Sequence, residues 1–302
     1  MTRTHLIGII VVLLITNIAT LLMLERGDMG LWVHREEEWE ISSSDDSVAR
    51  IDGEEISYED WMSALHESYG EKTLKYLIDR HVVSKLAEER DIEISEKVIE
   101  RDLAYLTSMQ GPLTEDELEK EKEKWRDEII YRYQLEFLLT EGVSIPENEI
   151  GKYYHNYKNQ YNFRPAMQLS HIVVPDMETA QKVYEELGQG ANFELLAKEY
   201  SVDEETKDNG GYLGFINTNS QFFPRGYLEV AKQLEEHSYS EPFTVDQGVA
   251  IIFLHQALPG IEFSFEEIKP YIKNELALHR ENIALEATSL WQEVDIDWIY
   301  AN

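Results

Sequence analysis

The longest apolar segment of the chain lies at its N-terminus. Residues 6–24, LIGIIVVLLITNIATLLML, form a run of 19 residues without a charge. As a helix this run would be about 28 Å long, close to the roughly 30 Å hydrocarbon core of a bilayer. A cleaved secretory signal is the alternative, but such signals have a shorter apolar stretch and end in a small-x-small motif, which is missing after Leu24. The pattern therefore predicts an uncleaved transmembrane anchor.

Charges on either side of residues 6–24 set the predicted orientation. Arg3 precedes the run, and acidic residues dominate directly after it. Because positive charge stays on the cytoplasmic side, residues 1–5 are predicted to be cytoplasmic, and the bulk of the chain to lie outside the cytoplasmic membrane. Residues 25–47, rich in Glu, Ser and Asp, are interpreted as an acidic tether.

Apolar positions between residues 48 and 165 recur mostly with helical spacing. The exception is residues 48–56, where Asp52-Gly53 suits the positive φ angles of a type I′ turn and predicts a small hairpin. Thr114 and Glu117 have the spacing of a capping box, which predicts the start of a long helix. Helices are expected over residues 57–68 and 74–90, from Ser95, over residues 114–140, and from Pro146.

The pattern changes after Pro165. Residues 169–174 (LSHIVV) are predicted to form a short buried strand, and residues 249–256 form a mostly apolar run of β type. The segment between these runs is expected to contain helices over residues 179–187 and 193–200, a long loop over residues 201–219 that is rich in Gly, Asn and Asp, and a helix after Pro224. This order of elements predicts a compact α+β domain over residues 166–260.

The chain returns to helical spacing at Ser264, where a second capping box begins. Residues 294–300 (VDIDWIY) alternate apolar and acidic side chains, as a half-buried strand does. We expect this strand to pair with the hairpin at residues 48–56. The helical domain would then be discontinuous, with residues 48–165 and 264–302 closing around the inserted α+β domain.

Composition narrows the range of functions. The 302 residues include 27 basic and 59 acidic side chains, a formal net charge of −32, which argues against binding of nucleic acid phosphates. The absence of cysteine excludes disulfides, thiol nucleophiles and Cys-based metal sites, and the nine histidines show no metal-ligand spacing. The chain contains no phosphate-binding glycine loop and no nucleophilic serine motif, so we expect neither a cofactor nor a metal.

Five segments in sequence order resemble the signature of parvulin peptidyl-prolyl cis-trans isomerases. They are SHIVV at 170–174, FELLAKEYS at 193–201 with Asp203 after it, GGYLG at 210–214, QFFP at 221–224 and GVAII at 248–252. The flanking helical parts resemble the chaperone halves of PrsA- and SurA-type extracytoplasmic foldases. The resemblance covers residues 48–302, and it implies a parvulin domain inserted in a helical foldase domain.

The resemblance also implies which residues form the site. In this family two histidines and an Asp or Cys line a polar floor, and apolar side chains hold the proline ring of the substrate. His171 matches the first histidine, and Asp203 matches the Asp/Cys position. The positions of the proline pocket are occupied by Leu213, Phe222 and Tyr227.

One position departs from the family pattern. The family motif ends in Gly-Tyr-His-Ile-Ile, whereas this chain has GVAII, so Ala250 replaces the second histidine. Because side chains alternate along a strand, His255 is predicted to lie on the opposite face from Ala250 and not to reach the same pocket. A histidine restored at position 250 is predicted to raise activity.

The sequence therefore predicts a membrane-anchored peptidyl-prolyl isomerase that assists the folding of secreted proteins. Its partners would be unfolded polypeptides with X-Pro bonds, the membrane through residues 6–24, and a second copy in a homodimer. The alternative is a parvulin-like chaperone that holds unfolded chains and is weak or inactive as a catalyst because of Ala250.

Overall fold

The computed structural model describes residues 47–220 and 224–300. The predicted anchor (6–24), the cytoplasmic residues before it and nearly all of the predicted tether lie outside the described residues, as does Phe222. In the part that is described, none of the helices combines the length and the apolar character needed to cross a bilayer. The described residues divide into two compact units, one up to Gly70 and one from Glu71 onward, which are described separately below.

The first unit begins with the predicted hairpin. Strands β1 (Ser47–Ile51) and β2 (Glu54–Ser57) pair antiparallel. Asp52 and Gly53 both have positive φ, 50° and 93°, as a type I′ turn requires. Helix α2 (Tyr58–Glu89) follows, and the Ser57 hydroxyl accepts a hydrogen bond from the Asp60 backbone N–H. The predicted hairpin and the predicted helix start are thus both confirmed.

Helix α2 is continuous, whereas two helices, 57–68 and 74–90, were expected. Gly70 lies between the two expected helices, but an interior glycine costs a helix only about 1 kcal/mol relative to alanine. Ending one helix and nucleating another costs more, because nucleation fixes several residues for a single hydrogen bond. The buried side chains of α2 are confined to its C-terminal part, at Val82, Val83, Leu86 and Ala87.

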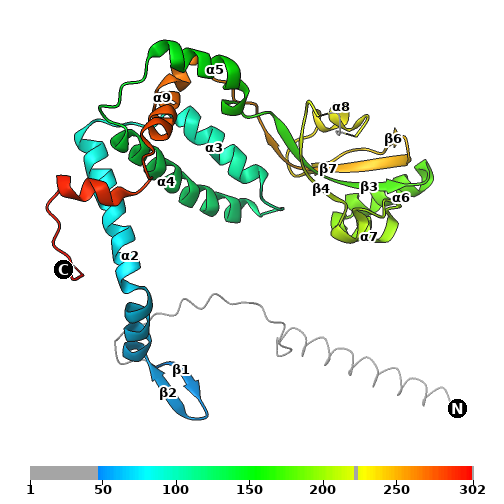
Figure 1. The fold of residues 1–302 in the computed structure, drawn as a ribbon. Helices are drawn as coiled ribbons and strands as arrows, with labels where there is room; N and C mark the ends of the chain where they lie inside the picture. Colours follow the sequence, from blue (N-terminus) through cyan, green and yellow to red (C-terminus); the bar gives the residue numbers. More distant parts are fainter. Residues whose placement is uncertain (1–46, 221–223, 301–302) are drawn as a thin grey trace, which may run out of the picture. The chain divides into compact units, whose positions relative to one another are not determined.

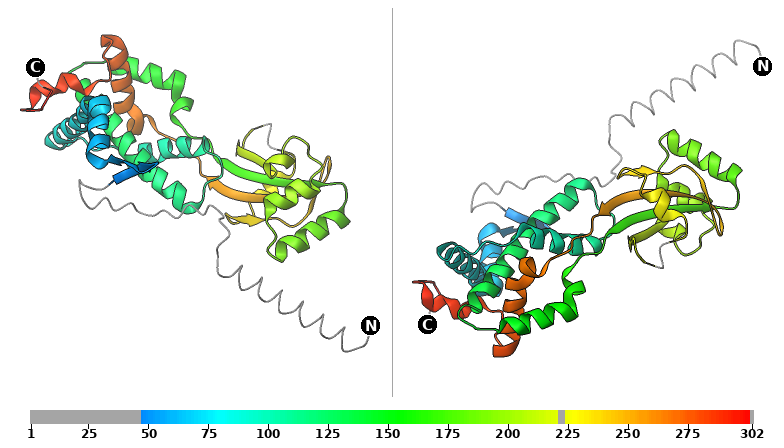
Figure 2. Two further views of the ribbon diagram at one scale, coloured as in Figure 1. Left: turned by 90° about the horizontal axis from the view of Figure 1, so that it is seen from below. Right: turned by 90° about the horizontal axis from the view of Figure 1, so that it is seen from above.

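Four helices of the second unit share one core. They are α3 (Glu96–Ser108), α4 (Glu115–Leu139), α5 (Glu147–Tyr161) and α9 (Phe265–Glu281). The predicted capping box at the start of α4 is present, and Glu267 accepts hydrogen bonds from Ser264 at the start of α9. Although α9 follows the sheet in sequence, it packs on α4 and α5, so both ends of this unit contribute to the helical core (Figure 2).

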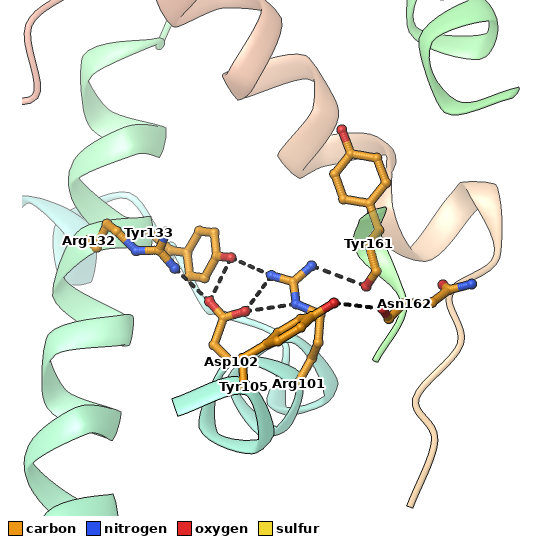
Figure 3. Close-up of polar contacts among 7 residues, drawn as sticks. All are labelled: Arg101, Asp102, Tyr105, Arg132, Tyr133, Tyr161 and Asn162. Atoms are coloured by element: carbon orange, nitrogen blue, oxygen red, sulfur yellow. Dashed lines mark hydrogen bonds and ion pairs between the residues drawn. The ribbon is translucent and has the colours of Figure 1, made fainter. Parts of the chain in front are cut away.

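A buried polar network joins three of these helical segments (Figure 3). The Arg101 guanidinium on α3 donates to Asp102 and to the Tyr133 hydroxyl on α4, over 2.7 and 2.6 Å. Asp102 also accepts from Arg132 and from Tyr133, and burial raises the pKa of Tyr133 to about 12. The Tyr161 carbonyl at the end of α5 accepts from Arg101. Because each charge has an opposite partner, the network links the helices rather than offering a free site.

Residues from the middle of the second unit's sequence form a five-stranded antiparallel sheet. Its order is β4-β3-β7-β5, with β6 paired to β7 (Figure 1). The long strands β3 (Ala166–Val174) and β7 (Gly248–Leu258) lie next to each other at its centre. The shorter strands are β4 (Tyr212–Asn217), β5 (Ser238–Tyr239) and β6 (Phe243–Val245). The prediction of a single loop over residues 201–219 was therefore wrong in its second half, which forms β4.

The two faces of this sheet carry different helices. Ile172 and Val174 of β3 pack against α6 (Met177–Gly188) and α7 (Phe193–Tyr200). Leu169 and Val173 face the opposite side, toward α8 (Tyr227–Ala231). Figure 1 shows α8 above the sheet and α6 with α7 below it. The alternation of side chains along β3 thus decides which residues face α8, and His171 is one of them.

The predicted C-terminal strand is absent. After the 3₁₀ helix η2 (Ala287–Glu293), residues 294–300 form no ladder, and the sheet of β1 contains only β2 among the described strands. Val294 and Ile296 instead pack on a cluster formed by α2 and α4, and the Trp298 ring lies 5.2 Å from that of Trp291. Packing on helices buries these alternate side chains, so the alternation did not require a strand.

Candidate active site

His171 lies at the centre of a hydrogen-bonded cluster on the α8 face of β3. Its side chain is buried, with 7% of the residue exposed. Nε2 lies 2.7 Å from Asp203 Oδ2 and 2.9 Å from Thr206 Oγ1. On the other side of the ring, Nδ1 lies 2.7 Å from the Tyr227 hydroxyl. Both ring nitrogens therefore have partners from other elements of the fold.

The segment between α7 and β4 brings Asp203 and Thr206 to the histidine. At one end, the Val202 N–H donates to the Val173 carbonyl over 2.7 Å. At the other end, the His171 N–H donates to the Gly211 carbonyl over 2.8 Å. Because its two ends are attached to β3 at Val173 and at His171 itself, the loop between them has little freedom to move its carboxylate away.

Gly211 permits this close approach. Its φ is +74°, and a Cβ on it would lie 1.9 Å from the His171 carbonyl oxygen. No side chain fits at that distance, so a glycine is required both by the backbone angle and by the contact. The GGYLG segment thus has a structural reason for its second glycine.

The protonation states follow from burial and hydrogen bonding. Burial lowers the pKa of His171 below its usual value, although Asp203 opposes this, so the ring is neutral at pH 7. Burial alone would raise the pKa of Asp203, but hydrogen bonds from Thr206 and His171 outweigh it and hold that pKa below its usual value. Nε2 of the neutral ring therefore carries the proton and donates to the ionised carboxylate.

A cavity of about 310 Å³ opens beside this cluster. His171 and Asp203 line it, and so do Leu213 and Tyr227, two of the three residues expected in the proline pocket. Phe222, the third, lies outside the described residues. Additional walls come from Val173, Thr206, Pro224 and Val245, and the charged side chains Glu205, Arg225 and Asp246 also line the cavity.

Position 250 offers no polar group to this cavity. Ala250 is fully buried on β7, opposite Val173 of β3 and Phe243 of β6. His255 does not replace the missing histidine, because its Nε2 pairs with the Ser170 hydroxyl over 2.8 Å and it lines a different cavity. Ala250 belongs to the cluster on the α8 face. The His255 ring instead contacts Phe253, whose ring packs at a tilt against Phe193 of α7.

Sequence reasoning missed Thr206 and the hydroxyl contact of Tyr227. Thr206 Oγ1 donates to Asp203 Oδ2 over 2.5 Å, and the Lys207 N–H donates to the Asp203 carbonyl. Asp203 and Thr206 lie in one turn, and their spacing of three residues brings their side chains together. Tyr227 was expected only as an apolar wall, and no local pattern indicates that its hydroxyl reaches His171.

This arrangement suits binding and polarisation rather than bond making. A neutral imidazole, a carboxylate and two hydroxyls form a fixed polar floor, and apolar side chains form the adjoining wall. Among the described residues that line the cavity there is no strong nucleophile. Chemistry that needs only a shaped, partly apolar pocket with fixed dipoles, such as rotation about an amide bond, fits this set of groups.

Comparison with known proteins places the sheet region in a defined family. The family described as "Rotamase: PPIC-type PPIASE domain" matches residues 176–256. This range contains Asp203, Leu213, Tyr227 and Ala250, while His171 lies five residues before it. The match therefore covers the loop, α8 and most of β7.

Relatives extend the similarity to most of the chain. A putative peptidyl-prolyl cis-trans isomerase, YacD of Bacillus subtilis strain 168, is 37% identical over 260 residues, which are 86% of this chain and 87% of that protein. The foldase protein PrsA of Halalkalibacterium halodurans is 31% identical over 253 residues, 80% of this chain and 74% of that one.

The chain was also compared with solved structures. The crystal structure of PrsA from Bacillus subtilis is 22% identical, with 85% of this chain and 96% of that one covered and a TM-score of 0.33. A SurA-like chaperone of Campylobacter jejuni is 20% identical, with 84% and 100% covered and a TM-score of 0.36. On the sequence relationships, this chain belongs to the family of PrsA- and YacD-type peptidyl-prolyl cis-trans isomerase foldases, which carry a PpiC-type parvulin domain.

Proposed function

We propose that this protein is a peptidyl-prolyl cis-trans isomerase that acts as a foldase on unfolded polypeptides, with the His171 cavity as its catalytic site. The observation that carries the proposal is the buried imidazole, held between Asp203 and Tyr227 at the floor of a cavity whose wall includes Leu213. In this proposal His171 and Asp203 are the catalytic residues. Leu213, Phe222 and Tyr227 seat the proline ring.

The physical task is to lower a torsional barrier. Rotation about an X–Pro bond faces about 18–20 kcal/mol because twisting removes the amide resonance. The twisted amide has less charge separation than the planar one, so an apolar wall favours it relative to water. A carboxylate held near the substrate carbonyl oxygen acts in the same direction, since it disfavours the negative charge that resonance places there. A thousandfold acceleration requires about 4 kcal/mol from these effects together.

Refolding of a model protein limited by proline isomerisation tests this proposal. The full chain should accelerate the slow phase at catalytic concentration, and His171→Ala should abolish the acceleration. His255→Gln is the matched control, because it alters a second part-buried histidine on the other face of the sheet. Equal acceleration by His171→Ala and the unaltered protein would refute the assignment of this site.

The alternative is a holdase without isomerase activity, which rests on Ala250. In that case the protein suppresses aggregation of an unfolded client to the same extent with and without His171→Ala, and does not accelerate the slow phase. The polar partners of His171 favour the catalytic reading, because a pocket used only for binding has no need of a fixed imidazole. The two outcomes are separated by running both assays on the same preparations.

The sequence also supports a location outside the cytoplasmic membrane. In our proposal residues 6–24 are a single-pass anchor, residues 1–5 are cytoplasmic, and residues 25–47 tether the remainder on the outer side. The support is the uncharged run and the flanking charges. Protease added to intact protoplasts should remove the chain after residue 24, and alkaline carbonate should leave the intact protein in the membrane pellet. Release by carbonate, or protection from protease, would contradict this placement.

The proposed domain organisation follows from the shared cores. The helical foldase domain consists of residues 48–165 and 264–302, and the parvulin domain of residues 166–260. The helical core that includes both α5 and α9 supports this division.

We also propose a homodimer, because Ile51, Trp61 and Tyr69 at the start of the described chain are exposed apolar side chains. Light scattering of the protein without residues 1–46 should give twice the protomer mass.

A further inference from the structure

Tyr227 makes a contact that its expected role as an apolar wall does not explain. The side chain is buried, with 3% of the residue exposed, and its hydroxyl lies 2.7 Å from His171 Nδ1. Tyr227 is the first residue of α8, and Gly226 before it has a φ of +86°. That left-handed turn, which favours glycine, directs the start of α8 toward the sheet.

The direction of this hydrogen bond follows from the other side of the ring. Asp203 is ionised and accepts from Nε2, so the proton of the neutral imidazole resides there. Nδ1 is then a lone-pair acceptor, and the Tyr227 O–H must be the donor. Burial raises the pKa of Tyr227, and the Asp203 charge adds to this, so the hydroxyl keeps its proton throughout the physiological range.

The surroundings of Ala250 explain why this partner comes from α8. A methyl group is all that β7 contributes at the position where the family resemblance places a second histidine. Ala250 lies opposite Phe243, and the Phe243 ring packs edge-on against the Tyr227 ring at 5.4 Å. The Tyr227 and Phe243 rings thus pack in the same cluster as Ala250, and the tyrosine carries the polar atom that β7 lacks.

We infer that Tyr227 is a positioning residue, whose hydroxyl donates to His171 Nδ1 and holds the ring as the neutral Nε2–H tautomer against Asp203, in place of the polar partner that Ala250 cannot supply. This inference rests on the proposed isomerase site, which it deepens by naming the group that fixes its histidine. It makes Tyr227 more than a contact for the proline ring.

A donor to Nδ1 stabilises only the neutral ring, because the protonated ring has no lone pair there. Removing the hydroxyl should therefore make His171 easier to protonate, by about one pKa unit for one hydrogen bond. The charged groups that line the same cavity, Asp203, Glu205, Arg225 and Asp246, are unchanged by Tyr227→Phe, so they contribute equally before and after the substitution.

The experiment is ¹⁵N NMR of the histidine side chains in the whole protein, for the unaltered chain, Tyr227→Phe and Tyr212→Phe. Tyr212→Phe is the matched control, since it removes a tyrosine hydroxyl that accepts from Gln168 on the same strand as His171. We expect a protonated Nε2 and a hydrogen-bonded Nδ1 in the unaltered protein and in the control. In Tyr227→Phe, Nδ1 should move to the shift of a free acceptor, and the His171 pKa should rise by about one unit.

Isomerase kinetics on a proline peptide provide the second readout. We expect Tyr227→Phe to lower kcat about tenfold with a smaller change in KM, because the ring keeps its apolar contacts but the imidazole loses one fixed end. An unchanged Nδ1 shift and pKa in Tyr227→Phe would overturn the inference, whether or not the protein is active. If Tyr227→Phe does not fold, the unaltered protein still decides, since a protonated Nδ1 would overturn the inference. If the unaltered protein shows the expected spectra but has no isomerase activity, the proposed function is refuted and the tautomer assignment stands.

Discussion

His255 should make the sheet region sensitive to acid, and the structure gives the size of the effect. The ring is half-buried on the face opposite the site and pairs with the Ser170 hydroxyl. Burial lowers the pKa of His255 to about 4, and the neighbouring His237 contributes in the same direction. An unfolded chain has a histidine pKa near 6.5.

The sign follows from which state binds the proton first. As the pH falls below about 6.5, the unfolded chain becomes protonated at His255 while the folded protein does not, so the free energy of unfolding decreases. The loss continues until the pH reaches the folded pKa of about 4. At pH 4.5 these two pKa values correspond to a loss of about 2–3 kcal/mol relative to pH 7.5. Above pH 6.5 the neutral ring has no such effect.

Hydrogen exchange of the β7 amides measures this loss directly. β7 lies at the centre of the sheet, so its protected amides exchange through opening of the whole sheet region. The comparison is between the unaltered protein and His255→Gln, because glutamine keeps a hydrogen-bonding group beside Ser170 but has no charge to gain. After correction for intrinsic exchange, the free energy of opening should fall by about 2–3 kcal/mol more in the unaltered protein than in His255→Gln between pH 7.5 and 4.5. A difference under about 0.5 kcal/mol would refute the argument, since His255 would then be protonated within the folded protein.

Substitutions at Gly211, Asp102 and Ala250 test other parts of the account, the first two beside a control substitution. In a urea titration, Gly211→Ala should lower the free energy of unfolding by about 2–5 kcal/mol, and it should abolish activity, because its Cβ would clash with the His171 carbonyl. The control is Gly190→Ala, at a position with a similar φ of +92° but no atom within 4 Å of the added Cβ. It should lower the free energy of unfolding only by the backbone strain of about 1 kcal/mol. Asp102→Ala should lower the free energy of unfolding by about 3 kcal/mol, because it leaves Arg101 buried without a counter-charge. Glu96→Ala, which removes an exposed ion pair, should lower it by under about 1 kcal/mol. Equal losses would mean that the Arg101–Asp102 network is solvated. Ala250→His should lower the free energy of unfolding by about 1–3 kcal/mol, because Ala250 is fully buried and its neighbours leave no space for a larger side chain. For the same reason we expect no rise in kcat/KM, although the sequence alone predicted one. Higher activity in a folded variant would support the sequence-based prediction.

The elements that sequence predicted correctly are those specified by local rules. Asp52-Gly53 forms the expected turn, and Thr114 with Glu117 forms the expected capping box, because both depend on residues within four positions. Strand β4 was missed since its sequence, YLGFIN, contains a glycine and follows a glycine pair. Its strand conformation comes from pairing with β3, which is a long-range contact that local propensity does not encode.

The C-terminal segment and α2 illustrate the converse problem. Alternation in residues 294–300 is consistent with a strand, but it is equally satisfied when Val294 and Ile296 pack on helices. The continuity of α2 across Gly70 depends on the difference of about 1 kcal/mol in helix propensity between glycine and alanine, and packing of the helix outweighs a difference of this size.

The candidate site divides in a similar way. Family resemblance identified His171, Asp203 and Leu213, and the fold brings all three to one cavity. The resemblance also indicated the loss at Ala250. It could not reveal the hydroxyl of Tyr227 as the partner of Nδ1, because that contact depends on how α8 enters over the sheet. A residue expected as a hydrophobic wall thus became a candidate for polar positioning only when its distance to His171 was known.

The central claim is that the cavity beside His171 lowers the barrier to X–Pro rotation, and exchange NMR on a short proline peptide tests it most directly. A short peptide has no tertiary fold to protect from aggregation, so a protein that merely holds unfolded chains leaves its cis-trans exchange rate unchanged. The account predicts faster exchange with the full chain and with His255→Gln, and no acceleration with His171→Ala. An exchange rate that is the same with and without the protein, or acceleration that survives His171→Ala, would contradict it.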